Sequence, residues 1–246
     1  MLEVLLGLLI AVSIGLTGVG GGTITTSVLI LGLGIAPEVA VGTALLFALC
    51  AKIPAGLIYW QQQQVHPQTL ARLLAGGVPA VVIGSFLLHA LKSYRDVVLL
   101  GIGLIVLVAA GINLFVTLIK VPSFHLAPGW MIAGAGFIGL EVGFSSAGAG
   151  ALGTLLLLNT TRLSPQAVVG TDLWFGLILS AIGGGIHTVL GQFDLWLFLK
   201  LTGGGVIGSL AGAWLAQHVS QRPFRLGLLA WMMVIGSHLV FRSLMR

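Results

Sequence analysis

Long apolar stretches dominate this sequence. Eight follow one another, each near or above the ~20 residues that an α-helix needs to cross the ~30 Å hydrocarbon core of a bilayer. They cover roughly residues 4–33, 38–60, 69–91, 97–119, 129–159, 166–190, 195–217 and 224–244. Only 7% of the 246 residues are charged, against about 25% in soluble domains. The pattern excludes a soluble enzyme or nucleic-acid-binding protein and predicts an all-α polytopic membrane protein.

The formal net charge of +5 does not indicate a nucleic-acid partner. The eleven Lys and Arg residues are spread thinly and lie mostly near the ends of apolar stretches, as residues that set topology and anchor helices do. No loop is long enough for a soluble domain. We therefore expect a multi-pass protein of the cell membrane, in bacteria the inner membrane, which acts inside the bilayer. The sequence leaves a homo-oligomer open.

Two of the stretches are too long for one untilted helix. A continuous helix over residues 4–33 or 129–159 would measure about 45 Å, and each stretch has a glycine-rich centre, at residues 18–23 and 145–150. Glycine runs favour a break in a helix. A broken helix at membrane depth is tolerated where it is packed in protein or lines a cavity. We expect each stretch to form two half-helices joined by a non-helical centre.

The chain is duplicated at an offset of 128 residues. Residues 15–87 align with residues 143–215 without a gap. The identical pairs include Pro37/Pro165, Val41/Val169, Gly42/Gly170, Thr43/Thr171, Phe47/Phe175, Gly56/Gly184, Gln64/Gln192 and Gly76/Gly204. The duplication predicts two homologous four-segment membrane repeats, residues 1–120 and 121–246, a plan common among secondary transporters. Small residues spaced four apart predict close helix packing in both repeats: Gly76, Ala80, Gly84 and Gly204, Gly208, Gly212.

The sequence leaves the relative orientation of the repeats open. If each broken segment crosses the membrane fully, each repeat has four crossings and the repeats are parallel. If the segment folds back at its glycines, three crossings remain and the repeats are inverted. The positive charges of the loops barely separate the two alternatives.

The repeated motifs resemble the TauE/SafE sulfite exporter family. In each half a glycine-rich broken segment precedes a Val-Gly-Thr motif, at residues 40–44 and 168–172, and a Gly-x-x-Asp turn at residues 191–194 precedes a glycine-rich helix. The resemblance covers nearly the whole chain. It implies transport of sulfur-containing anions such as sulfite, thiosulfate or sulfonates.

This chain departs from the family pattern at three motif positions. Ala44 and Asp172 stand where the family often has Ser, and the first Gly-x-x-Asp turn reads Gln63-Gln64-Val65-His66. The proline that follows the break in many family members is missing from both halves. These departures bear on the substrate and the coupling ion more than on the fold.

The glycine-rich breaks are the predicted substrate site. The N-terminus of a half-helix presents free N–H groups and a partial positive charge, which suit an oxyanion. The expected cradle consists of Gly20, Gly22, Thr23, Ser145, Ser146, Gly148 and Gly150, with further hydroxyls from Thr25 and Thr26. The alternative is that these glycines only allow helices to pack closely. Thr43 and Thr171, in the first turns of their helices, either face the breaks and bind the anion or cap and pack.

Charged residues at membrane depth are functional candidates by default. Lys52 lies near the centre of its stretch, where snorkelling is difficult; it either attracts the anion or forms an ion pair with Glu141 or Asp172. Glu141 and Asp172 are candidates to carry a coupling proton. His187 either joins such a proton relay or is a satisfied interfacial histidine. Its place near a helix end favours the second.

The leading interpretation is a secondary transporter, an exporter of sulfite or a related anion such as thiosulfate or a sulfonate, with proton coupling as a candidate energy source. A passive anion channel with the same architecture is the alternative. Arg72 and Lys200 occupy matching positions and either snorkel to the interface or flank the mouth of an anion path. No residue pattern indicates catalysis, a metal or a cofactor, so we expect none of them.

Overall fold

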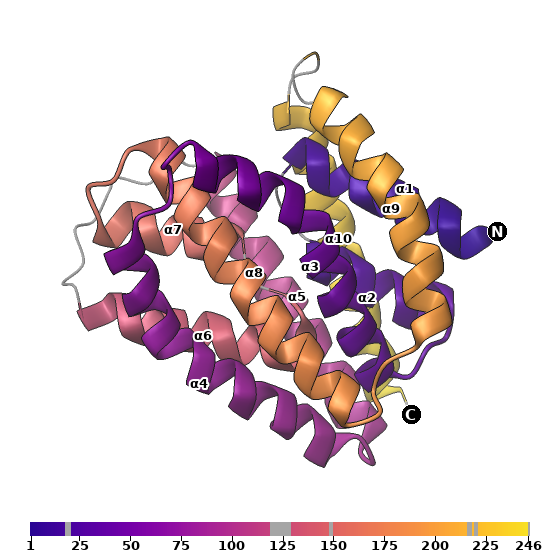
Figure 1. Ribbon diagram of the computed structural model, residues 1–246. Coiled ribbons are helices and arrows are strands. Elements are labelled where there is room, and N and C mark those ends of the chain that lie inside the picture. Colours follow the sequence, from indigo (N-terminus) through magenta and orange to yellow (C-terminus); the bar gives the residue numbers. More distant parts are fainter. Residues whose placement is uncertain (18–20, 119–128, 148–149, 216–217, 219–220, 246) are drawn as a thin grey trace.

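The computed structural model describes residues 1–17, 21–118, 129–147, 150–215, 218 and 221–245, and the regular secondary structure of these residues is entirely α-helical (Figure 1). Ten helices lie in this part of the chain: α1 (Leu2–Thr17), α2 (Gly21–Gly32), α3 (Pro37–Gln61), α4 (Pro67–Leu91), α5 (Arg95–Leu118), α6 (Gly129–Ser145), α7 (Ala151–Thr160), α8 (Pro165–Val189), α9 (Leu195–Leu215) and α10 (Gln221–Leu244).

Six helices are long and apolar enough to cross a membrane: α3, α4, α5, α8, α9 and α10. The helices of the two over-long stretches are shorter. With 16 residues α1 measures about 24 Å, and with 17 residues α6 measures about 26 Å, both less than a ~30 Å hydrocarbon core. In agreement with the predicted breaks, α1 ends at Thr17 before α2 begins at Gly21, and α6 ends at Ser145 before α7 begins at Ala151.

Side-chain caps mark the start of α4 in the first half and the start of α9 in the second half. Asp194 Oδ1 accepts the backbone N–H of Leu197 at 2.9 Å at the start of α9. In the first half His66 Nδ1 accepts the N–H of Thr69 at 3.2 Å at the start of α4. A side-chain acceptor at this position satisfies an N–H that has no partner within the helix. His66 therefore replaces the aspartate of the Gly-x-x-Asp turn in its capping role.

Glycines bring α4 against α6 and α1 against α9 (Figure 1). A Cβ on Gly76 or Gly84 of α4 would collide with the carbonyl oxygen of Ile132 or Leu140 of α6. The second pair of helices repeats this arrangement, with Gly204, Gly208 and Gly212 of α9 against Val4, Leu8 and Val12 of α1. These helices approach as closely as backbone allows, which is how membrane helices associate without a hydrophobic driving force.

The contacts also give the helix directions. α3 and α8 are antiparallel, because Gly42 near the start of α3 lies against His187 near the end of α8, and Gly56 near the end of α3 lies against Leu173 early in α8. α5 and α10 are antiparallel as well, since Gly103 lies against Leu239 and Gly236 against Leu107. By the same reasoning the contacts of the previous paragraph make α4 parallel to α6 and α1 parallel to α9.

When each helix is replaced by its counterpart 128 residues away in the chain, the set of helix contacts stays the same. The α1–α9 contact corresponds to α6–α4, the α2–α3 contact to α7–α8, and the α3–α9 contact to α8–α4. The α3–α8 and α5–α10 contacts correspond to themselves. Most of the close packing therefore joins an element of residues 1–120 to one of residues 121–246, so the two halves interlock.

Candidate functional site

Two residues of the second glycine-rich segment, between α6 and α7, have positive φ angles. Ser146 has φ 59° and Gly150 has φ 120°, a region that residues other than glycine rarely adopt. The buried Ser145 Oγ donates to the carbonyl of Glu141 at 2.9 Å and accepts the N–H of Ala147 at 3.2 Å. The side chain of Ser145 therefore satisfies backbone groups where α6 ends.

The two glycine-rich segments of the chain meet at Ser146. Gly22, in the first turn of α2, lies so close that a Cβ there would collide with the carbonyl oxygen of Ser146. Thr26 Oγ1 and Ser146 Oγ are 2.5 Å apart and share a hydrogen bond. The predicted residues Gly22 and Ser146, 124 positions apart in the chain, are thus brought into direct contact.

The remaining predicted cradle residues fall into three groups. Thr23 and Thr25 are buried in the first turns of α2, where Thr25 donates to the carbonyl of Gly21. Gly150 precedes α7 and supplies no side-chain cap, while the Asp172 carboxyl group lies against Gly153 in the first turn of α7. Gly20 and Gly148 lie outside the described residues.

Thr43 and Thr171 connect the two halves through matched hydrogen bonds. Thr43 Oγ1 accepts the backbone N–H of Asp194 at 3.3 Å, and Thr171 Oγ1 accepts the N–H of His66 at 3.0 Å. Both hydroxyls are fully buried. Thr43 thus holds the turn before α9, and Thr171 holds the turn before α4, each in the opposite half. This is the capping and packing alternative; a substrate contact by either residue stays a prediction.

Asp172 and Lys52 form the charged part of the site. Asp172 is buried, its Oδ2 accepts a hydrogen bond from Thr154 Oγ1 at 2.7 Å, and its Oδ1 has no hydrogen-bond partner among the described residues. Lys52, partly buried on α3, interacts electrostatically with Asp172. The two form no ion pair within 4 Å in the described part of the chain. Of the two predicted carboxylate partners, Asp172 is thus the one near Lys52.

Glu141 is buried one turn before the end of α6. Its side chain is 3% exposed, and its Oε2 has no hydrogen-bond partner within the described ranges. A buried carboxyl group without a partner destabilises a protein. Such a group at membrane depth is a functional candidate, so the position of Glu141 keeps it among the candidates for carrying a proton.

His187 is fully buried near the end of α8 and is hydrogen-bonded through both ring nitrogens. Nε2 lies 3.0 Å from the carbonyl oxygen of Gly143 on α6, and Nδ1 lies 2.7 Å from Oε1 of Gln192. The Gln192 amide nitrogen in turn lies 2.9 Å from Nδ1 of His89 on α4. His187 therefore has hydrogen-bond partners at both ring nitrogens, as one of its two predicted alternatives expects. One of these hydrogen bonds leads through Gln192 to a second histidine, His89.

Three residues of this site were not among the sequence predictions. Thr154 and Gln192 carried a signal in the repeat, because they are the identical counterparts of Thr26 and Gln64. His89 carried none, since its counterpart at the 128-residue offset is a glutamine and nothing in its own segment distinguishes it. It is found only through the fold, which brings the end of α4 beside the turn after α8.

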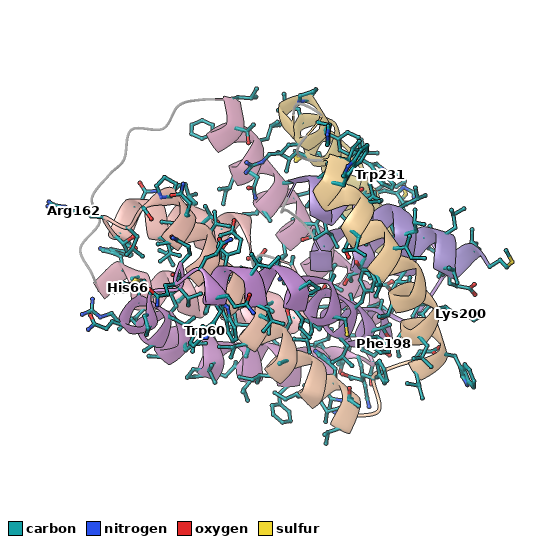
Figure 2. All side chains as sticks on the ribbon, turned by 45° about the horizontal axis from the view of Figure 1, so that its top comes forward. Trp60, His66, Arg162, Phe198, Lys200 and Trp231 are labelled. Atoms are coloured by element: carbon teal, nitrogen blue, oxygen red, sulfur yellow. The ribbon has the colours of Figure 1, made fainter. Side chains whose placement is uncertain are left out.

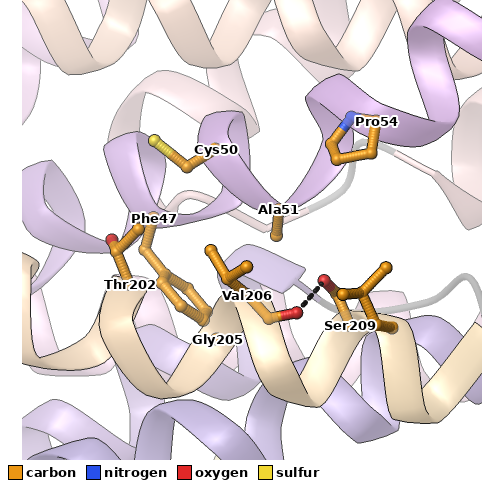
Figure 3. Close-up of a pocket in the computed structure, with 9 residues that line it drawn as sticks. Phe47, Cys50, Ala51, Pro54, Thr202, Gly205, Val206 and Ser209 are labelled. Carbon is orange, nitrogen blue, oxygen red and sulfur yellow. Dashed lines mark hydrogen bonds between the residues drawn. The ribbon is translucent and has the colours of Figure 1, made fainter.

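An apolar cavity of about 80 Å³ lies between α3 and α9, and Figure 3 shows the residues that line it. Phe47, Cys50 and Pro54 line one side, and Thr202 and Val206 line the other. The breaks contribute none of its lining residues. This cavity therefore suits an apolar group, and not the anion expected at the breaks.

The matched cations Arg72 and Lys200 differ in their contacts. Lys200 Nζ forms an ion pair with Glu3 Oε1 of α1 at 3.3 Å, at the edge of the molecule in Figure 2. Arg72 is exposed on α4. Both side chains are exposed at the surface, where a long side chain can snorkel.

These features define a class of protein. Six long apolar helices carry large apolar side chains on the outer surface, among them Phe86, Trp196 and Phe241, while charged and hydroxyl groups are buried at two helix breaks. A helical membrane protein that keeps polar groups inside and apolar groups outside is built to sit in a bilayer and handle a polar solute. The chain is a multi-pass membrane protein of the transporter class.

Comparison with known proteins gives the family. The family model described as Sulfite exporter TauE/SafE matches residues 3–239. The chain belongs to this family, as its motifs predicted. No solved structure matches the chain.

Two curated relatives from Bacillus subtilis (strain 168) are named as membrane transporters. "Probable membrane transporter protein YjnA" is 27% identical over 252 residues, which cover 96% of this chain and 98% of that protein. "Probable membrane transporter protein YtnM" is 30% identical over 233 residues, covering 86% of this chain and 73% of that protein. Neither name specifies a substrate.

Proposed function

We propose that the protein is a secondary transporter that exports sulfite or a related sulfur-containing anion, thiosulfate or a sulfonate, with the substrate bound at the two helix breaks. The contact between Gly22 and Ser146 carries this proposal, since it joins the glycine-rich segments of both halves at one buried point. The start of α7, where Gly150 supplies no side-chain cap, adds a partial positive charge that suits an anion. Family membership favours a sulfur-containing anion as the substrate.

We further propose that the two halves are inverted repeats. If α3 crosses the membrane in one direction, its antiparallel counterpart α8 crosses in the other. The same holds for α5 and α10, so the pseudo-two-fold axis that exchanges the halves lies in the plane of the membrane. This arrangement requires each broken segment to fold back, and it leaves three crossings per half, matching the six long helices.

The buried charges support proton coupling. Lys52 supplies a positive charge for the anion, and Asp172 lies within its electrostatic reach. Asp172 Oδ1 and Glu141 Oε2 lack partners in the described residues, so each can exchange a proton without breaking a hydrogen bond. A passive anion pore has no use for buried carboxylates, which repel its solute. The proposal therefore favours a proton-coupled transporter over a channel.

The test is uptake of sulfite, thiosulfate and sulfoacetate into proteoliposomes with an imposed pH gradient, with protein-free liposomes as the control. Saturable flux that follows the gradient is the expected result. Saturable flux that ignores the gradient would overturn proton coupling, and flux proportional to concentration would indicate a channel. Absence of flux for all three anions would overturn the proposed substrate class while leaving the family assignment intact.

A further inference from the structure

A chain of hydrogen bonds runs from the surface end of α4 to the second helix break. It begins at His89, which is partly exposed, continues through Gln192, which is 3% exposed, and reaches His187, which is fully buried. The distances along it are 2.9 Å from His89 Nδ1 to the Gln192 amide nitrogen and 2.7 Å from Gln192 Oε1 to His187 Nδ1. It ends at the carbonyl oxygen of Gly143, 3.0 Å from His187 Nε2.

His187 closes the C-terminal end of α6. In a continuing helix the Gly143 carbonyl would accept the N–H of Ala147, but that N–H donates to Ser145 Oγ instead. The neighbouring carbonyl of Val142 still has its helical partner, the N–H of Ser146. Among the described residues, the Gly143 carbonyl is therefore held by His187 Nε2, which must carry a hydrogen to donate to it.

Because Nε2 is committed to Gly143, the protonation state of His187 is decided at Nδ1. A neutral His187 accepts at Nδ1 from the amide N–H of Gln192, whose carbonyl oxygen then accepts from an N–H at His89 Nδ1. A protonated His187 donates from Nδ1 to the Gln192 carbonyl, and the amide N–H then donates to a bare Nδ1 of His89. Converting one arrangement into the other takes a half-turn of the carboxamide, together with loss of the proton from one Nδ1 atom and uptake of a proton at the other. The carboxamide oxygen and N–H of Gln192 both have hydrogen-bond partners only when one of the two facing Nδ1 atoms, and not both, carries a hydrogen.

Other titratable groups near α8 do not replace His89 in this chain. The helices packed against α8 carry Glu38, Cys50, Lys52 and Tyr59 on α3, Arg72 and His89 on α4, and Glu141 on α6, and α7 carries none. Of these, His89 interacts electrostatically with His187. Asp194, in the same turn as Gln192, is already committed to capping α9.

We propose that His89, Gln192 and His187 form a proton-sharing unit that controls the second helix break. When the proton resides on His187, a cation lies at the C-terminal end of α6, where the helix dipole favours positive charge, and the break is held as in this structure. When His187 loses that proton and His89 carries one at Nδ1, the hydrogen bond from Nε2 to the Gly143 carbonyl no longer comes from a charged ring and weakens. His187, Gln192 and His89 are thus positioning residues for the break. The role in transport rests on the proposed function, whereas the sharing of a proton does not.

The first test needs no transport. The protein is labelled with ¹⁵N-histidine, placed in lipid nanodiscs and titrated by NMR, with the His187 signals assigned by their loss in His187→Gln. We expect Gln192→Glu, whose carboxylate accepts from both rings, to keep His187 doubly protonated to a pH at least about one unit higher than in the unmodified protein. We expect His89→Ala to alter the same titration. Gln64→Ala, the repeat counterpart of Gln192, should leave it unchanged.

The second test measures the pH profile of anion flux for the same variants. A profile whose midpoint moves in Gln192→Glu and His89→Ala, but not in Gln64→Ala, supports control of the break. Identical His187 titrations in all variants would overturn the proton-sharing unit, even if flux is normal. If the titrations are coupled and no anion is moved by any variant, the proposed function fails and the proton-sharing unit stands. If titrations are coupled and flux profiles are identical, control of the break is overturned.

Discussion

The two helix breaks have the same architecture and different chemistry. At the 128-residue offset, Glu141, Asp172 and His187 around the second break correspond to Ser13, Ala44 and Tyr59 around the first. The backbone contacts are shared, since α4 packs on α6 as α9 packs on α1. The duplicated scaffold therefore supplies two helix breaks, but the groups that can exchange protons are gathered at one of them.

A single pair of threonines shows the difference at the level of hydrogen bonds. Thr26 on α2 is bonded to Ser146, a neutral hydroxyl of the other half. Its identical counterpart Thr154 on α7 is bonded to the carboxylate of Asp172. The same side chain thus joins the halves at the first break and holds a titratable group at the second. If this asymmetry is functional, substitutions at the first break should act by disturbing packing contacts. Substitutions at the second break should act by changing which groups can be protonated.

The largest expected effect comes from the contact between the breaks. Gly22→Ala places a Cβ against the carbonyl oxygen of Ser146, where there is no room for it. Overpacking of a close contact costs about 1–3 kcal/mol, and here the backbone of both breaks must shift. We expect anion flux in proteoliposomes to fall by about 100-fold or more, with a lower Tm in detergent.

The matched control is Gly185→Ala on α8. A Cβ there would meet no heavy atom within 4 Å in the described part of the chain, and alanine is the better helix former. This variant should keep the flux and the Tm of the unmodified protein. Equal behaviour of the two variants would mean that the contact between the breaks has no role in transport.

Lys52 offers the next largest effect. Lys52→Ala removes the partly buried cation near Asp172 and should raise the apparent KM for sulfite by at least about 10-fold, which corresponds to about 1.4 kcal/mol of binding free energy. Ser180→Ala, at the counterpart position on α8, should leave KM unchanged because it removes no charge. Binding and flux that survive in Lys52→Ala would exclude Lys52 from the substrate site.

The carboxylates give a smaller and more selective effect. Asp172→Asn and Glu141→Gln keep the shape of each side chain but remove the ability to exchange a proton. We expect each to reduce the dependence of flux on an imposed pH gradient several-fold, with flux in the absence of a gradient largely retained. Asp96→Asn, in the exposed first turn of α5, is the control. Unchanged pH profiles for both variants would mean that neither Asp172 nor Glu141 carries the coupling proton.

The fold was predictable from the sequence to the extent that the bilayer dictates it. Apolar stretches of spanning length predicted the long helices, and the glycines at residues 18–23 and 145–150 predicted where two stretches are interrupted, because both signals are local. The direction of α8 relative to α3 was not predictable. It depends on which helices pack together, and loop charges alone could not separate full crossing from folding back.

The site was predictable only where the repeat carried a signal. Gly22 and Ser146 were identified because glycine and serine cluster at the breaks, and Thr43 and Thr171 because they are repeated. The capping role of the two threonines could not be read from sequence, since their partners lie more than 100 residues away. His89 could not be found at all, because a helix packing direction brings it to Gln192.

The smallest effect concerns the matched cations at the surface. Lys200 is paired with Glu3 at 3.3 Å, with side chains 46% and 27% exposed, whereas Met131 stands at the position that would give Arg72 the same partner. Exposed ion pairs contribute little and are screened by salt. Glu3→Gln should therefore change the Tm only slightly at low ionic strength and not at all at 1 M NaCl, with flux unaffected. If Lys200→Ala instead weakened sulfite uptake while Glu3→Gln strengthened it, Lys200 would be a cation at the mouth of the anion path. The asymmetry between the halves would then extend from the buried carboxylates to the surface.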